Sequence, residues 1–107
     1  MIKLRTWAGK SQFSYNGSVK AGTEIYYGKK PYRIAVSSAK YHELLKHFSK
    51  NSVNIGTSKT DPPRGSVGEW LQKNVTKTAI ASYVGPILIH EGYAEKVDRS
   101  ACPSQVF

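Results

Sequence analysis

The sequence predicts an α+β fold in which an N-terminal antiparallel sheet of three to four strands packs on about three helices. Two observations carry this prediction. Residues 1–36 alternate apolar and polar side chains with the period of two that is typical of strands. From residue 38 the apolar side chains recur with the spacing of amphipathic helices. We therefore expect one domain over residues 1–107, with a strand-rich basic part at 1–36, a helical part at 37–97 and a loose tail at 98–107.

The first strand is predicted in MIKLRTW, where apolar and cationic residues alternate. We expect Ile2 and Leu4 to face the core, and Lys3, Arg5 and Trp7 to face the other way. For Trp7 a position in the core is an equal alternative. A second strand, SQFSY, follows after a Gly-Lys break.

Residues 22–36 predict a β-hairpin whose turn lies at 28–31. Pro31 does not suit a central strand, so the second arm begins at the turn or lies near a sheet edge. We expect Tyr26 and Arg33 to share the surface opposite the apolar face. That apolar face takes alternate residues of both arms: Ile25, Tyr27, Tyr32, Ile34 and Val36.

Two helices are predicted in the middle of the chain. Residues 41–48 carry apolar side chains at i, i+3, i+4 and i+7, and either Ser37 or Ser38 can cap that helix. A short strand, SVNI, follows. Ser66 and Glu69 then fit the S-x-x-E capping box at the start of the second helix.

The third predicted helix carries apolar residues at helical spacing from Ile80 to Leu88. Thr76 or Thr78 can cap its start, and Gly92 is a suitable stop. Pro86 either kinks this helix or begins a second short one. YAEKV reads as a final strand, and Glu91, Glu95 and Asp98 are expected to be solvated.

The order helix, strand, helix, helix, strand over residues 38–97 resembles a winged helix, a family of helix-turn-helix domains. The segment TAIASYVGPILIHEGYAEKV carries the resemblance. Ala81-x-x-x-Gly85 is similar to the small-residue spacing of a helix-turn-helix, and LIHEGYAEKV is similar to a recognition helix that runs into a wing strand. The sequence departs from the family because no second wing strand is expected.

The presumed recognition helix is apolar on nearly every side, with Lys77, Ser82 and His90 as its main polar positions. Base readout needs Arg, Lys, Asn or Gln on the outer side of such a helix. We therefore expect this helix to be buried. It would lie in the core, or in a homodimer formed through residues 80–89.

The net positive charge and its distribution along the chain are the most informative features of the sequence for function. Sixteen Lys and Arg face seven Asp and Glu, and residues 1–60 hold eleven of these cations but only two acids. Such asymmetry favours a polyanion partner, with nucleic acid, DNA or RNA, as the first candidate. We expect a non-enzymatic nucleic-acid-binding protein in which cations bind phosphates and an exposed aromatic stacks on bases. The candidate residues are Lys3, Arg5, Trp7, Lys29, Lys30, Arg33, Lys40, Lys46, Lys59 and Arg64.

The loop GTSKTDPPRGSVGE at 56–69 is a further candidate for phosphate binding. It lacks the Walker pattern, because Ser58 stands where a glycine must precede Lys59. A polar connector is the plainest interpretation. The alternative is a phosphate grip, in which Lys59 and Arg64 flank the free N–H groups at the start of the following helix.

Two other classes of function stay open. The first is a small interaction module that binds an acidic protein partner through the same surface. The second is a metal-independent ribonuclease that uses His42, His47 and nearby lysines. No metal or cofactor is expected, since the histidines lack ligand spacing and Cys102 is the single cysteine. The absence of a long apolar run or an h-region predicts a cytoplasmic protein without a membrane partner.

Overall fold

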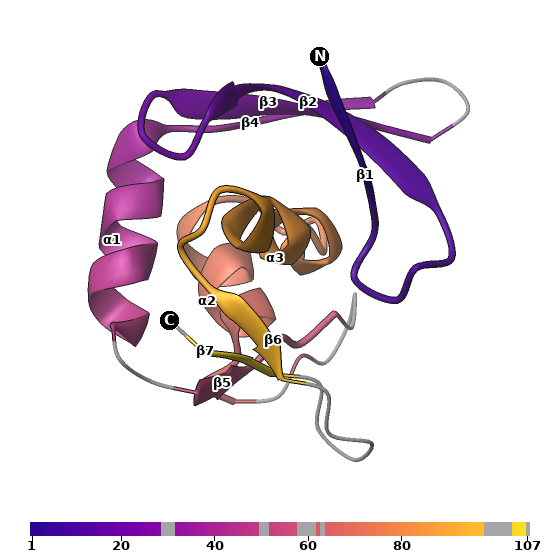
Figure 1. Ribbon diagram of the computed structural model, residues 1–107. Helices are drawn as coiled ribbons and strands as arrows, with labels where there is room; N and C mark the ends of the chain where they lie inside the picture. The colour runs from indigo at the N-terminus through magenta and orange to yellow at the C-terminus, as the bar shows by residue number, and fades with distance from the viewer. Residues whose placement is uncertain (29–31, 50–51, 58–61, 63, 98–103, 107) are drawn as a thin grey trace.

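The computed structural model describes residues 1–28, 32–49, 52–57, 62, 64–97 and 104–106, and it confirms the α+β fold (Figure 1). Four strands form an antiparallel sheet in the order β1-β2-β3-β4. These strands are β1 (Ile2–Arg5), β2 (Gln12–Ser18), β3 (Gly22–Tyr27) and β4 (Tyr32–Val36).

The rest of the described chain forms three helices and a second, three-stranded sheet in the order β5-β7-β6. The helices are α1 (Ser38–Phe48), α2 (Val67–Asn74) and α3 (Ala81–His90), and the strands are β5 (Ser52–Asn54), β6 (Glu95–Val97) and β7 (Ser104–Val106). In Figure 1, α3 lies in the middle, between the N-terminal sheet, α1 and the small sheet.

The register of the N-terminal sheet confirms the predicted faces of the hairpin. Ile25 pairs with Ile34, and Tyr26 pairs with Arg33 on the opposite face. Two side chains predicted for the core are nevertheless exposed: Ile2 to 37% and Tyr32 to 61%. Each is the first residue of an edge strand, which has a neighbouring strand on one side only.

Helix α1 follows its predicted pattern. Ser37 is the N-cap, and its hydroxyl accepts a hydrogen bond from the Lys40 N–H. Tyr41, Leu44 and Phe48 are buried on the face toward the core. The Tyr41 hydroxyl meets Thr23 Oγ1 at 2.7 Å, and burial raises the pKa of Tyr41 to about 12.

Helix α3 is continuous through Pro86, so the expectation of a separate second helix is wrong. Proline has no N–H to donate to the Ser82 carbonyl one turn earlier. That carbonyl instead accepts the backbone N–H of Trp7 at 2.9 Å. The hydrogen bond that Pro86 cannot make within the helix is thus replaced by one from Trp7. This bond attaches the segment that follows β1 to α3.

The two ends of α3 differ in how well the sequence predicted them. Neither Thr76 nor Thr78 caps it, because its N-cap is Ile80 without a side-chain bond. The predicted stop at Gly92 is confirmed: its φ is 84°, and it donates to the Ile89 carbonyl while Tyr93 donates to Leu88. These bonds form a Schellman motif, which needs a left-handed residue at this place.

The tail expected to be loose contains a strand. Residues of β7 pair with β5 on one side and with β6 on the other, so β7 is the central strand of the small sheet. The expectation that no further strand follows residues 93–97 is therefore wrong. Ser104–Val106 is too short for an alternating pattern to be recognised in the sequence. It is a strand because it pairs with β5 and β6.

The presumed recognition helix lies in the core of its own chain. Ile80, Val84, Ile87 and Leu88 are fully buried. An added Cβ at Gly85 would lie 2.8 Å from Cε3 of Trp7, so the small residue lets that ring approach the helix. Most of the apolar surface that suggested a homodimer is therefore covered within the chain, while Pro86 and Ile89 stay partly exposed, and the dimer stays a prediction.

Candidate nucleic-acid interface

The outer face of the N-terminal sheet is the surface turned away from the core. Its members follow from the register, since residues paired across antiparallel strands lie on the same face and alternate along each strand. The outer face consists of Lys3, Arg5, Gln12, Ser14, Asn16, Glu24, Tyr26, Arg33 and Ala35.

Three of the predicted cations lie on this outer face. Lys3, Ser14, Tyr26 and Arg33 form one row across the four strands, so Lys3 and Arg33 stand three strand spacings apart, about 14 Å. Arg5 lies two residues further along β1, about 7 Å from Lys3. Lys3 and Arg5 are exposed and form no ion pair with a described residue. Neither charge is therefore matched by a described carboxylate, although Arg5 Nη1 donates to the Gly9 carbonyl at 3.1 Å.

Glu24 is the single acid of the outer face, and it organises the centre. Its Oε2 accepts the Tyr26 hydroxyl at 2.7 Å and lies 3.2 Å from Arg33 Nε. The hydrogen bond to Glu24 raises the pKa of Tyr26. Because the Arg33 and Glu24 side chains are 59% and 46% exposed, water screens this ion pair. A phosphate can therefore replace the Glu24 carboxylate as the partner of Arg33 at little cost in free energy.

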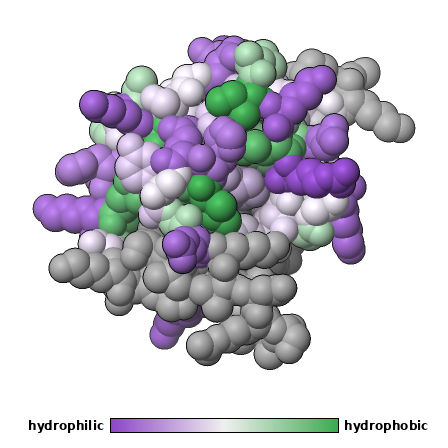
Figure 2. Space-filling view, viewed as in Figure 1, coloured by the Kyte–Doolittle hydropathy of each residue, from purple (hydrophilic) through white to green (hydrophobic). Residues whose placement is uncertain are grey.

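A shallow groove of about 260 Å³ crosses the outer face beside Tyr26. Its lining residues carry cationic, amide and hydroxyl groups, and the described ones include no acid. Its residues are Lys3, Gln12, Phe13, Ser14, Tyr26, Tyr27 and Gly28. Figure 2 shows hydrophilic side chains among apolar ones at the top of the molecule, where Figure 1 draws the N-terminal sheet.

Trp7 does not belong to this surface, and its prediction as an exposed stacking residue is wrong. Only 7% of it is exposed, and its ring packs against Gly85. The chain turns after Arg5, and the Trp7 N–H is drawn to the Ser82 carbonyl, so strand alternation no longer sets its direction. The alternative position in the core is correct.

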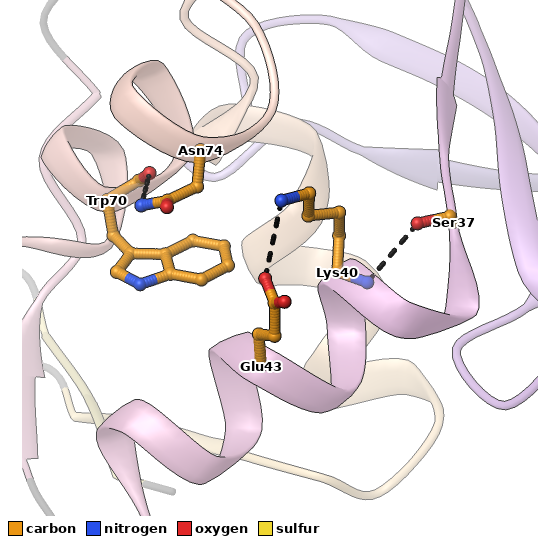
Figure 3. A network of polar contacts seen from close by, with 5 residues as sticks. All are labelled: Ser37, Lys40, Glu43, Trp70 and Asn74. Atoms are coloured by element: carbon orange, nitrogen blue, oxygen red, sulfur yellow. Dashed lines mark hydrogen bonds and ion pairs between the residues drawn. The ribbon is translucent and has the colours of Figure 1, made fainter.

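The two predicted lysines of α1 do not belong to the strands that form the outer face. Lys46 is exposed, while the Lys40 ammonium pairs with Glu43 at 3.3 Å. Figure 3 shows Lys40 and Glu43 paired on α1 and the Trp70 ring of α2 directed toward them, while the Asn74 amide bonds the Trp70 carbonyl of its own helix. Lys40 also borders an open hollow of about 490 Å³ that reaches Asn16 and Glu24 of the sheet.

The phosphate grip at the start of α2 stays a prediction, because Lys59 lies outside the described residues. Arg64 is exposed, and three N–H groups near the start of α2 already have acceptors. Gly68 donates to the Ile55 carbonyl and Glu69 to the Ser66 hydroxyl, while the Glu69 carboxylate accepts from Gly65 at 3.0 Å. The Ser66 cap is confirmed, and the Glu69 carboxylate bonds the residue just before the cap in a variant of the capping box.

Three further candidates, Lys29, Lys30 and Lys59, lie outside the described residues. Of the predicted set, the structure therefore places Lys3, Arg5 and Arg33 on one face of the sheet. Lys40 borders a hollow that reaches this face, and Lys46 and Arg64 are exposed on other segments.

Tyr27 and Tyr32 form an aromatic cluster with Phe13 and Tyr83 at one end of the sheet. Tyr27 stacks on Tyr83 with centroids 4.9 Å apart, and Tyr32 lies 5.6 Å from Tyr27. The packing role predicted for Tyr27 is confirmed, since it is half-buried against α3. Tyr32 closes the cluster from outside and keeps an exposed ring.

The histidines proposed for a ribonuclease do not meet. His42 borders a hollow with Lys20 and Tyr93, whereas His47 packs beside Phe48 and Trp70. Among the described residues, no three His, Cys, Asp or Glu side chains gather as metal ligands would.

Sequence reasoning missed the role of Glu91, which was expected to be solvated. Its carboxylate accepts the Tyr15 hydroxyl at 2.7 Å and the Val19 N–H at 2.9 Å. It thereby joins the end of α3 to β2 and its following turn. A carboxylate directly before the helix-stopping Gly92 was the available signal, because helix C-termini favour cations rather than acids.

Comparison of the chain with protein-family models, with curated proteins and with solved structures finds no significant match. None of the helices in the described ranges has the length and apolar character needed to cross a membrane.

Proposed function

We propose that this chain is a non-enzymatic nucleic-acid-binding protein that contacts phosphates through the outer face of its N-terminal sheet. One observation carries the proposal: Lys3, Arg5 and Arg33 share a face on which Glu24 is the only acid. Cations spaced across a sheet attract a polyanion from a distance and then neutralise successive phosphates.

Single-stranded DNA or RNA is the form that suits this face. Single-strand binders combine a positively charged path with aromatic rings on which bases stack. Here Tyr26 lies between Lys3 and Arg33 in the same row, and the groove beside it offers Gln12 and Ser14 as hydrogen-bonding groups. The buried α3 presents no base-reading side chains, which argues against helix insertion into a duplex.

The test is fluorescence anisotropy with labelled single-stranded DNA, RNA and duplex DNA at several salt concentrations. Three phosphate contacts predict a slope of log K against log salt of about −2 for single strands, because each contact contributes about 0.7. Arg33→Gln and Lys3→Gln should each make the slope shallower by about 0.7. Lys77→Gln is the matched control, since Lys77 is exposed in the segment before α3.

Two results would refute the proposal. Absence of binding at low salt would make the positive charge a solubility feature. Binding that Arg33→Gln, Lys3→Gln and Lys77→Gln weaken equally would show a diffuse charge effect rather than an interface on the sheet.

A further inference from the structure

Strand β1 leaves one edge of the N-terminal sheet open. It is the terminal strand of the order β1-β2-β3-β4, and no described strand pairs with its other side. The Thr6 N–H donates to the Ser11 carbonyl, which places Thr6 in a hydrogen-bonded pair with β2. Such pairs alternate along antiparallel strands, so the backbone groups of Lys3 and Arg5 point away from β2 toward the open edge.

An apolar groove of about 320 Å³ runs beside this edge, between β1 and the last turns of α3. Its lining contains no acid and is formed by Leu4, Arg5, Thr6, Trp7, Pro86, Ile89 and His90. Figure 2, drawn in the orientation of Figure 1, shows hydrophobic surface over the region of β1 and α3 with hydrophilic side chains around it. The groove and the open edge together form a surface with both backbone and side-chain recognition groups.

We propose that this surface binds an extended peptide of a protein partner by adding it as a fifth strand next to β1. Strand addition uses the unpaired N–H and C=O groups of a sheet edge for affinity and flanking pockets for specificity. This interaction shares Lys3 and Arg5 with the nucleic-acid contact on the outer face, but it uses the backbone edge and the apolar groove and does not rest on that proposed function.

The chemistry of the partner follows from the two sides of β1. Successive side chains of an added strand point to opposite faces of the sheet. One set would enter the groove beside Leu4, Pro86 and Ile89, which favours apolar residues. The other set would lie on the outer face beside Lys3 and Arg5, which favours Asp and Glu. The partner segment therefore alternates apolar and acidic residues.

The same geometry disfavours a second copy of this chain as the occupant. Two β1 strands paired edge to edge would bring the exposed Lys3 and Arg5 of both copies together on one face. Like charges across strands destabilise such a pair. An acidic peptide has the opposite effect.

The experiment measures anisotropy of a labelled peptide that alternates valine and glutamate. A peptide of the same composition with its valines and glutamates in separate blocks is the control for alternation. Lys3→Gln removes the charge but keeps the N–H at the open edge, whereas Lys3→Pro removes both. Proline is tolerated where an edge-strand N–H faces outward, so the sheet should persist, and circular dichroism verifies this.

We expect the alternating peptide to bind at least about tenfold more tightly than the block peptide. Lys3→Pro should weaken that binding by a further factor of about ten relative to Lys3→Gln, because a backbone hydrogen bond is lost. Methylation of the peptide amides should have the same effect without any change in the protein.

Equal affinity for the two peptides, or equal affinity of the Lys3→Pro and Lys3→Gln variants, would overturn the strand-addition proposal. Dimerisation in sedimentation that Lys3→Pro abolishes would also overturn it, since a second copy would then occupy the edge. Arg33 lies at the far edge of the sheet, so failure of this proposal and failure of the nucleic-acid proposal give different patterns across the variants.

Discussion

Replacement of Glu91 by glutamine is the most direct test of how α3 is attached to the N-terminal sheet. The carboxylate accepts two hydrogen bonds, from the Tyr15 hydroxyl at 2.7 Å and from the Val19 N–H at 2.9 Å. Tyr15 is fully buried, so its hydroxyl has no access to water as a substitute partner. Burial, reinforced by the Glu91 hydrogen bond, raises the pKa of Tyr15.

The expected magnitude follows from these two bonds. A hydrogen bond to a charged acceptor contributes about 1.5–3 kcal/mol, against about 1 kcal/mol for a neutral one. Glutamine keeps one carbonyl oxygen but turns an NH₂ group toward one of the two donors. Glu91→Gln should therefore lower the free energy of unfolding by about 2–3 kcal/mol, and Tyr15→Phe by about 1.5 kcal/mol.

Urea denaturation followed by far-UV circular dichroism measures both values, and the double variant measures their coupling. We expect a coupling of about 1–2 kcal/mol, because Tyr15 and Glu91 share one of the lost bonds. The matched control is Glu95→Gln, an exposed glutamate near the same helix end, with an effect within about 0.5 kcal/mol. A Glu91→Gln effect as small as that of the control would refute the attachment role.

Two further predictions concern the core. Gly85→Ala should destabilise the chain by about 1–3 kcal/mol, because the added Cβ would press on the Trp7 ring. Thermal unfolding measures this effect, with Ser82→Ala on the same helix as the control. An effect of Gly85→Ala no larger than that of the control would contradict the prediction. Stability should also fall between about pH 10 and pH 12, by up to about 1.4 kcal/mol per pH unit for Tyr41. Its folded pKa is raised to about 12, so the unfolded chain loses that proton first; a urea midpoint that stays constant over this window would count against the burial of Tyr41.

Much of the fold was predictable because the relevant signals are local. Alternation identified the strands of the N-terminal sheet, and Ser37, Ser66 and Gly92 marked helix ends through caps that involve nearby residues. The strand β7 was not predictable in this way. Its three residues become a strand only through pairing with β5 and β6, which lie far from it in sequence.

In the candidate interface, too, local patterns predicted some residues correctly, whereas distant contacts decided the position of others. The predicted face of Lys3 and Arg5 within β1, and that of Tyr26 and Arg33 within the hairpin, are correct, because period-two alternation fixes the face of each residue within a strand. Only the register across β2 shows that the two sets lie on one face of one sheet. Trp7 escaped the rule because it lies past the end of β1, where a hydrogen bond to α3 sets its direction. The bond from Gly68 to the Ile55 carbonyl at the start of α2 was not predictable from the loop, because Ile55 precedes it.

The sequence by itself determined the α+β class, the positions of the main elements and the concentration of positive charge in residues 1–60. These properties depend on side-chain period and composition, which are readable without long-range contacts. Only the tertiary structure decided that α3 is buried beneath the N-terminal sheet, that Glu91 joins the two, and that β1 presents an open edge beside an apolar groove. Each of these depends on which distant segments meet, and the free energy of that meeting is set by packing and hydrogen bonds that no local pattern contains.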